Sequence, residues 1–178
     1  IIETEQRNPV RRTSISRVGM SAGYVFPLND KFGEGYGSRS LNLGLTYYNE
    51  FQNNGGLTVE GMWSGNGFGV HLGFLKFTNI VDTSPFYGFG LGLHRTWYSF
   101  EEDYECYYGT CTRTEWYSSG GPAINLQAGV MLYRTYDINV LIRARYLHVF
   151  NDYSNNAFII DIGVQKKRGN RYGVLGLF

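Results

Sequence analysis

The sequence lacks the marks of several common protein classes. It contains no run of 18 apolar residues, so it predicts no transmembrane helix. Charged residues make up only 17% of its 178 residues, where about 25% is usual in soluble domains. The formal net charge of +1 argues against a general nucleic-acid binder, because such proteins usually carry a basic excess. A chain of this length fits one domain.

Cysteine is also scarce, with only Cys106 and Cys111, which lie in a polar stretch. This spacing alone is too loose for a zinc site, and the sequence indicates no other metal site and no cofactor. Two free thiols are one interpretation. We favour a short disulfide, because exposed thiols are a liability and oxidising compartments pair them.

The abundant residues are Gly (24), Tyr (15) and Phe (12), and they follow a strict alternation. In residues 86–100, FYGFGLGLHRTWYSF, large apolar side chains alternate with glycine and polar groups. A β-strand puts alternate side chains on opposite faces, so this segment predicts a strand with one apolar face and one crowded polar face. The same pattern recurs near residues 17–26, 39–50, 57–63, 68–74, 124–132, 138–150 and 158–164.

Eight such strands predict an all-β fold, an eight-stranded antiparallel barrel with up-and-down meander topology. We expect an N-terminal lead at residues 1–13 and the barrel at 14–167. Residues 168–178 are then a C-terminal tail or the end of the last strand.

Alternation alone does not say which face points inward. A soluble lipocalin-like barrel would turn its apolar face inside. A transmembrane barrel is favoured because the polar face is rich in Gly and poor in Lys and Glu, which suits a narrow interior. The expected connections also alternate between long and short, as in outer-membrane barrels. Aromatic residues lie near the strand ends, as in interfacial girdles: Tyr24, Phe26, Tyr47, Trp63, Tyr87, Trp97, Tyr146 and Phe150.

Three further features carry a family resemblance: the ARYLHVF segment (144–150) before an Asn-rich loop, the AFIIDIGVQ strand (157–165), and the terminal Phe178. Together with the eight strands they resemble the small OmpA/OmpX-like outer-membrane barrel superfamily. The resemblance implies an integral protein of the outer membrane, in contact with the lipid bilayer and lipopolysaccharide. One departure is that strong alternation ends near Lys166, before Phe178.

Several ionisable side chains fall on the interior parity. We expect an interior ion-pair network from these residues: Arg17, Glu60, His71, His94, Arg143, Arg145 and Asp161.

Counting residues outward from the centre of each expected hairpin turn gives the cross-strand pairs. Arg145 is then opposite Asp161 across the last loop, and Glu60 is opposite His71 across the two-residue Gly65-Asn66 turn. One interpretation is a set of satisfied ion pairs that plug the lumen, since an unpaired charge there is costly. The other is a polar ladder for a proton or small solute.

The interior parity also carries two glycine tracks, at residues 67–73 and 88–92. They either make room for side chains from across the barrel or form a slot for an acyl chain, as in the palmitoyl-transfer barrels.

The expected outer rim carries polar candidates on the lipid side. Arg95 is costly at mid-membrane, so we expect it, with Trp97, near lipopolysaccharide phosphates at the interface. His148, with Asp152 and Ser154, resembles the arrangement in lipid A deacylase barrels and would supply a catalytic set. The alternative for His148 is a side chain that reaches the lipid headgroups.

The stretch 101–119 is expected to be a long loop that mixes acids with Tyr and Trp. It suits either an adaptable recognition surface or a solvated cap. We interpret the protein as non-enzymatic, a structural or interaction protein that holds other outer-membrane proteins through this loop or its lipid face, as a subunit of a larger complex. A lipid A-modifying enzyme and a small-solute channel are the alternatives.

Overall fold

The computed structural model describes residues 15–28, 40–51, 54–65, 67–79, 81–107, 109–152 and 155–168. The expectations for the N-terminal lead (1–13), for Phe178 and for all of the tail except Arg168 lie outside these residues. The described residues contain no helix long and apolar enough to cross a membrane. Their strands are β1 (Ile15–Pro27), β2 (Ser40–Glu50), β3 (Gly55–Ser64), β4 (Gly67–Phe77), β5 (Ser84–Cys106), β6 (Gly109–Leu132), β7 (Ile138–Val149) and β8 (Asn155–Arg168).

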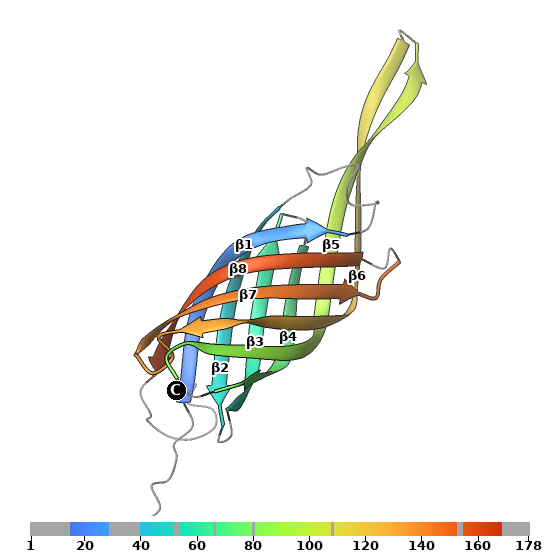
Figure 1. The fold of residues 1–178 in the computed structure, drawn as a ribbon. Coiled ribbons are helices and arrows are strands. Elements are labelled where there is room, and N and C mark those ends of the chain that lie inside the picture. Colours follow the sequence, from blue (N-terminus) through green and yellow to red (C-terminus); the bar gives the residue numbers. More distant parts are fainter. Residues whose placement is uncertain are drawn as a thin grey trace, which may run out of the picture.

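The eight strands form a closed antiparallel barrel in chain order, and β8 pairs with β1 (Figure 1). The all-β barrel and its meander topology are as the sequence predicts. Strands β1, β3, β5 and β7 run toward one end, which we call the ribbon end, and the other four run back to the terminal end. Closure pairs the backbone of every strand on both sides, which a strand inside lipid requires.

The alternation decides which side chains face the lumen. Along β7, residues 139, 141, 143, 145, 147 and 149 are all buried, and the residues between them are exposed or half-buried. The outward positions of the other strands carry large exposed hydrophobics, among them Met20, Leu45, Leu72, Leu93 and Ile162. The apolar face therefore points outward, as in a membrane barrel and not a lipocalin-like one.

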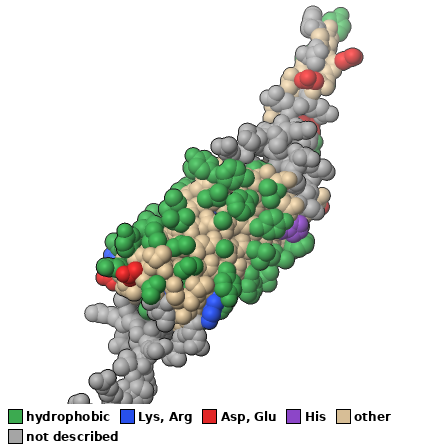
Figure 2. Space-filling view, in the orientation of Figure 1, with side chains coloured by type: hydrophobic (Ala, Val, Ile, Leu, Met, Phe, Trp, Pro, Cys, Tyr) green, Lys and Arg blue, Asp and Glu red, His purple; other side chains and the backbone are tan. Residues whose placement is uncertain are grey.

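The apolar belt ends in charged residues. On β4 the outward positions from Phe68 to Phe74 are apolar, and Lys76 follows them at the terminal end. The eight residue steps from Phe68 to Lys76 span about 27 Å along the strand. At a strand tilt of about 40° this is about 21 Å along the barrel axis, close to the roughly 25 Å height of the apolar band in known barrels. Figure 2 shows hydrophobic side chains over the visible wall of the barrel.

The expectation of a loop at residues 101–119 is wrong. Strands β5 and β6 continue through it as a two-stranded ribbon that rises beyond the barrel (Figure 1), with Trp97 opposite Ser118 and Cys106 opposite Gly109. The stretch is polar, but its Thr and aromatic residues are good strand formers, and cross-strand pairs hold it without a core. We call residues 97–106 and 109–118 the outer ribbon.

Candidate functional site: the layered lumen and the outer ribbon

The lumen is filled in layers, which the inward side chains of β7 mark in order. From the terminal end these are Asn139, Leu141, Arg143 with Arg145, and Leu147 with Val149. The interior therefore passes from a polar layer through an apolar layer, an ionic layer and a second apolar layer. An eight-stranded barrel is just wide enough to be filled by its own side chains in this way.

The ionic layer is a quartet of Glu60, Arg143, Arg145 and Asp161, each at most 3% exposed. Arg143 donates from Nε to Asp161 Oδ1 (2.6 Å) and from Nη1 to Glu60 Oε2 (3.0 Å). Arg145 donates from Nη1 to Glu60 Oε1 (2.8 Å) and from Nη2 to Asp161. Each carboxylate thus accepts from both guanidinium groups, and the quartet carries no net charge.

The strand register differs from the predicted one at one of the two expected cross-strand pairs. Asp161 lies opposite Arg143, not Arg145, because the β7–β8 connection centres one residue earlier than expected. Glu60 does lie opposite His71. Yet both ring nitrogens of His71 lack a hydrogen-bond partner among the described residues. The charged, forked guanidinium groups hold the Glu60 carboxylate instead.

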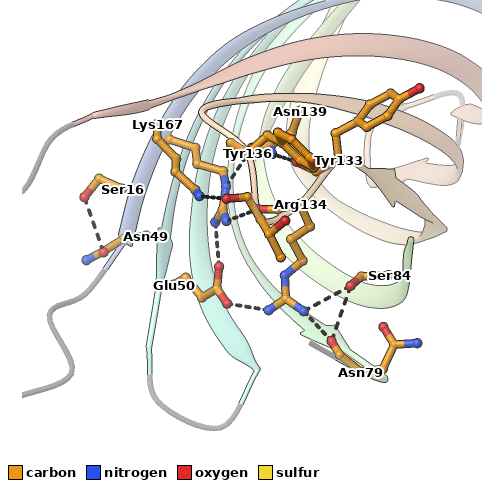
Figure 3. Close-up of polar contacts among 12 residues, drawn as sticks. Ser16, Asn49, Glu50, Asn79, Ser84, Tyr133, Arg134, Tyr136, Asn139 and Lys167 are labelled. Carbon is orange, nitrogen blue, oxygen red and sulfur yellow. Dashed lines mark hydrogen bonds and ion pairs between the residues drawn. The ribbon is translucent and has the colours of Figure 1, made fainter. Parts of the chain in front are cut away.

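A second ionic cluster closes the terminal end (Figure 3). Arg17, expected in the central network, lies here and donates from Nη1 to Glu50 Oε2 (2.5 Å) and from Nε to Asn139 Oδ1 (2.9 Å). Arg134 donates to the other oxygen of Glu50 and to Ser84 Oγ (3.2 Å). Its guanidinium carbon also lies 4.0 Å from the centre of the Phe77 ring.

Sequence reasoning missed Glu50 and Arg134. They lie at a strand end and in a turn, where alternation says nothing about the direction of a side chain. The only available signal was their charge.

Apolar clusters separate the polar layers. Toward the terminal end these side chains pack together: Tyr48, Leu75, Phe77, Phe86, Met131 and Leu141. Toward the ribbon end the cluster consists of Val25, Met62, Ala123, Leu147, Val149 and Ile159. Two apolar layers across a narrow lumen oppose the passage of hydrated ions.

We therefore expect no steady ion conductance from the folded protein in a planar lipid bilayer. Arg134→Ala, which opens only the terminal-end cluster, should be equally silent, because the quartet and both apolar layers remain. Discrete conductance steps that recur in independent porin-free preparations of the wild-type chain would contradict this expectation.

The lumen ends in a polar network at the ribbon end. Asn155 donates to Thr96 Oγ1 (2.6 Å), and Asn151 donates to the same oxygen (3.1 Å). Ser119 Oγ donates to Asp152 Oδ2 (2.8 Å). Below this network lies a cavity of about 30 Å³, whose wall includes His94, Thr96 and Asn155.

The residues of the enzyme alternative are not brought together. His148 is half-buried, shares a hydrogen bond with Asn156 through Nδ1, and meets the edge of Phe150 with the ring centres 4.3 Å apart. Asp152 bonds Ser119 instead. Ser154 lies outside the described residues.

We expect His148→Ala to leave lipid A unchanged, because this ring has an amide and an aromatic partner and makes no hydrogen bond to a hydroxyl group of the described residues. Mass spectrometry of lipid A from cells expressing either version checks this. A lipid A species present only with the wild-type chain would revive the enzyme alternative.

Arg95 and Trp97 lie on the outer wall at the ribbon end. Arg95 is opposite Phe68, close to the β3–β4 turn, and donates to Ser118 Oγ (2.8 Å). Trp97 Nε1 donates to the carbonyl oxygen of Gly65 (2.7 Å). Arg95 is thus held at the end of the apolar belt and not in its middle.

A disulfide cross-links the two strands of the outer ribbon near its tip. The disulfide between Cys106 and Cys111 is formed, as the sequence predicts, with the two Cα atoms 5.9 Å apart. Two large side chains are exposed: Tyr107 at the tip is 93% exposed, and Trp116, opposite Ser99 near the base of the ribbon, is 68% exposed. Asp103 is exposed too and accepts a hydrogen bond from Thr112 Oγ1 (2.9 Å).

Replacing both cysteines by serine should loosen the ribbon and leave the barrel unchanged. A disulfide that closes so short a loop stabilises it by about 2 kcal/mol, so trypsin should cut after Arg113 about tenfold faster or more. Reduced wild-type protein is the matched control and should behave like the double variant. Equal cutting rates for the oxidised and the reduced chain would mean that the strand pairs alone hold the ribbon.

Solved structures share this fold. Neisserial surface protein A (NspA) matches with a TM-score of 0.64 and 13% identity, over 86% of this chain and 97% of that one. The N-terminal β-barrel domain of Pseudomonas aeruginosa OprF gives 0.52 and 11%, over 85% and 97%. Ail, the attachment invasion locus protein of Yersinia pestis, gives 0.49 and 17%, over 87% and 97%. No family model and no curated protein sequence matches significantly. At these identities the matches to NspA and to the OprF domain show the fold alone, that of eight-stranded outer-membrane barrels.

Proposed function

We propose that this chain, which has the fold of an eight-stranded outer-membrane barrel, is a non-enzymatic interaction protein. The barrel anchors the outer ribbon, and the ribbon holds a protein partner beyond the membrane surface as part of a larger complex. The observation that carries the proposal is the ribbon itself, a stapled pair of strands that rises from a plugged barrel (Figure 1).

The outer edges of the ribbon, which lie beyond the strand ladders of the barrel, support this role. Strand β5 last pairs with β4 at Thr96, and β6 begins to pair with β7 at Ala123. Phe150 N–H still donates to the carbonyl oxygen of Pro122 (2.8 Å). Within the outer ribbon, the strand pairing of the described residues is that of β5 with β6. Unpaired strand edges are the sites where an extended partner segment can add by backbone hydrogen bonds.

Its composition favours a basic partner. Residues 97–118 contain five carboxylates and one arginine, a formal net charge of −4. The ribbon also exposes Tyr104, Tyr107 and Trp116, and tyrosine and tryptophan are residue types that often anchor a protein interface. Charges of one sign around such anchors select a partner of the opposite sign and speed its association.

The test is mild detergent extraction of the native outer membrane, followed by native mass analysis of the particles that carry this chain. A trimmed variant replaces residues 100–115 by Asn-Gly, a two-residue turn that fits the Ser99–Trp116 pair. We expect a stoichiometric complex with the full chain and a lone, folded barrel with the trimmed one. Asp103→Asn with Glu105→Gln, which keeps the ribbon, should weaken the complex and reduce its sensitivity to salt.

Two outcomes would overturn the proposal. A complex that survives trimming would move the interface to the lipid face. A lone barrel from the full chain would remove the interaction role.

A further inference from the structure

Two histidine rings lie side by side inside the barrel, on neighbouring strands. His71 of β4 and His94 of β5 are 2% and 6% exposed, and their ring centres are 5.8 Å apart at an interplanar angle of 47°. In the register, each histidine lies opposite a glycine: His71 faces Gly92, and His94 faces Gly69. Neither ring belongs to the quartet or to the terminal-end cluster.

The nitrogens of this pair lack partners. Nδ1 and Nε2 of His71 and Nδ1 of His94 are buried and have no hydrogen-bond partner among the described residues. A buried polar atom left in this state loses its hydration without compensation, so such atoms in native proteins usually hold a water or an ion.

Gly69 lies beside both rings and has no side chain that would separate them. A Cβ atom built on Gly69 would lie 2.2 Å from His94 Nδ1 and 3.0 Å from His71 Nε2. The two nitrogens are therefore at most 5.2 Å apart. The Cβ position itself is one bond length from the Gly69 Cα atom, so an ion would lie farther from the backbone. Metal–imidazole bonds are about 2.0–2.1 Å long, so one ion can bind both nitrogens once ring shifts of about 1 Å bring them within about 4.2 Å of each other.

We propose that His71 and His94 form a two-histidine site for a transition-metal ion of the Cu²⁺, Ni²⁺ or Zn²⁺ class. Nε2 of His71 and Nδ1 of His94 are its protein ligands, because neutral imidazole suits these ions. The described residues contain no group of three or more His, Cys, Asp or Glu side chains placed to hold a metal, so water completes the shell.

The surroundings admit such an ion. The cavity of about 30 Å³ beside His94 has room for water and is also lined by Ser64 and Thr96, at the ribbon end of the lumen. The quartet lies in the same lumen, and its two positive and two negative groups pair with one another. With two protein ligands the ion should exchange, and Cu²⁺ should bind most tightly of the three.

The test uses the folded full chain in detergent, without a polyhistidine tag, and Cu²⁺ as the probe. Electron paramagnetic resonance counts the nitrogens bound to the copper. His148→Asn removes the third histidine of the chain, on the outer wall, and serves as the background. In that background we expect a two-nitrogen signal at one equivalent of Cu²⁺.

Adding His71→Gln or His94→Gln should leave one nitrogen. Either substitution should lower the affinity for Cu²⁺ by more than about 10- to 100-fold, the usual cost of losing a residue that only hydrogen-bonds to a metal ligand. Gly69→Ala keeps both histidines, but its Cβ atom would lie against His94 Nδ1 and displace that ring, so it should abolish the two-nitrogen signal. Heat-modifiable migration in gels confirms that each variant is folded.

Each protein is also refolded in the presence of Cu²⁺, so that slow entry does not hide the site. A two-nitrogen signal absent under both conditions would overturn the proposal. A signal that persists in His71→Gln or His94→Gln would do the same, because the copper would then be bound elsewhere.

Discussion

Replacing Arg145 by methionine should destabilise the folded barrel by about 3–5 kcal/mol, the usual cost of removing one partner from a buried ion pair. Methionine has a similar length, so the packing of the lumen changes little. The charge balance changes more, because Arg143 alone then faces two buried carboxylates, Glu60 and Asp161. Urea unfolding of the protein in phospholipid vesicles measures the loss through the transition midpoint and slope.

A second substitution separates charge balance from packing. Glu60→Gln in the Arg145→Met background leaves one Arg143–Asp161 pair, with an amide that still accepts from Arg143. We expect the double variant to be more stable than Arg145→Met alone, with a coupling energy of about 0.5–3 kcal/mol. Strictly additive losses would mean that the four groups do not act as a unit.

The strands and the lumen side chains could be predicted because one face meets lipid and the other meets a narrow interior. A slip of one residue would put every apolar side chain on the wrong face, so the alternation determines the direction of each side chain. This is why Glu60, Arg143 and Asp161 could be assigned to the interior from sequence.

Alternation says nothing about pairing between strands or about turns. The residue directly opposite Asp161 depends on where the β7–β8 connection centres, and that residue is Arg143 where Arg145 was expected. Arg134 fills the terminal end from a turn. The ribbon was misjudged because polar alternation without a core, as at Thr112 and Thr114, resembles a loop in composition.

Placing an arginine in the middle of the apolar belt should cost about 2–4 kcal/mol, and the same change at its edge about 0–1 kcal/mol. Leu72 and Leu41 make a matched pair. Both are outward-facing leucines, 64% and 55% exposed, but Leu72 lies at the centre of β4 and Leu41 at the ribbon end of β2. Leu72→Arg should therefore destabilise the barrel much more than Leu41→Arg does.

The contrast tests the membrane position and not merely the loss of a leucine. Both variants lose the same side chain from an exposed site, so an aqueous environment would give two small and similar losses. In lipid, the guanidinium at residue 72 must reach about 10 Å or more to either interface, while that at residue 41 already lies near one, as Arg95 does. Unfolding in vesicles measures both losses. Equal losses at the two positions would contradict the placement of the belt between Phe68 and Lys76 on β4.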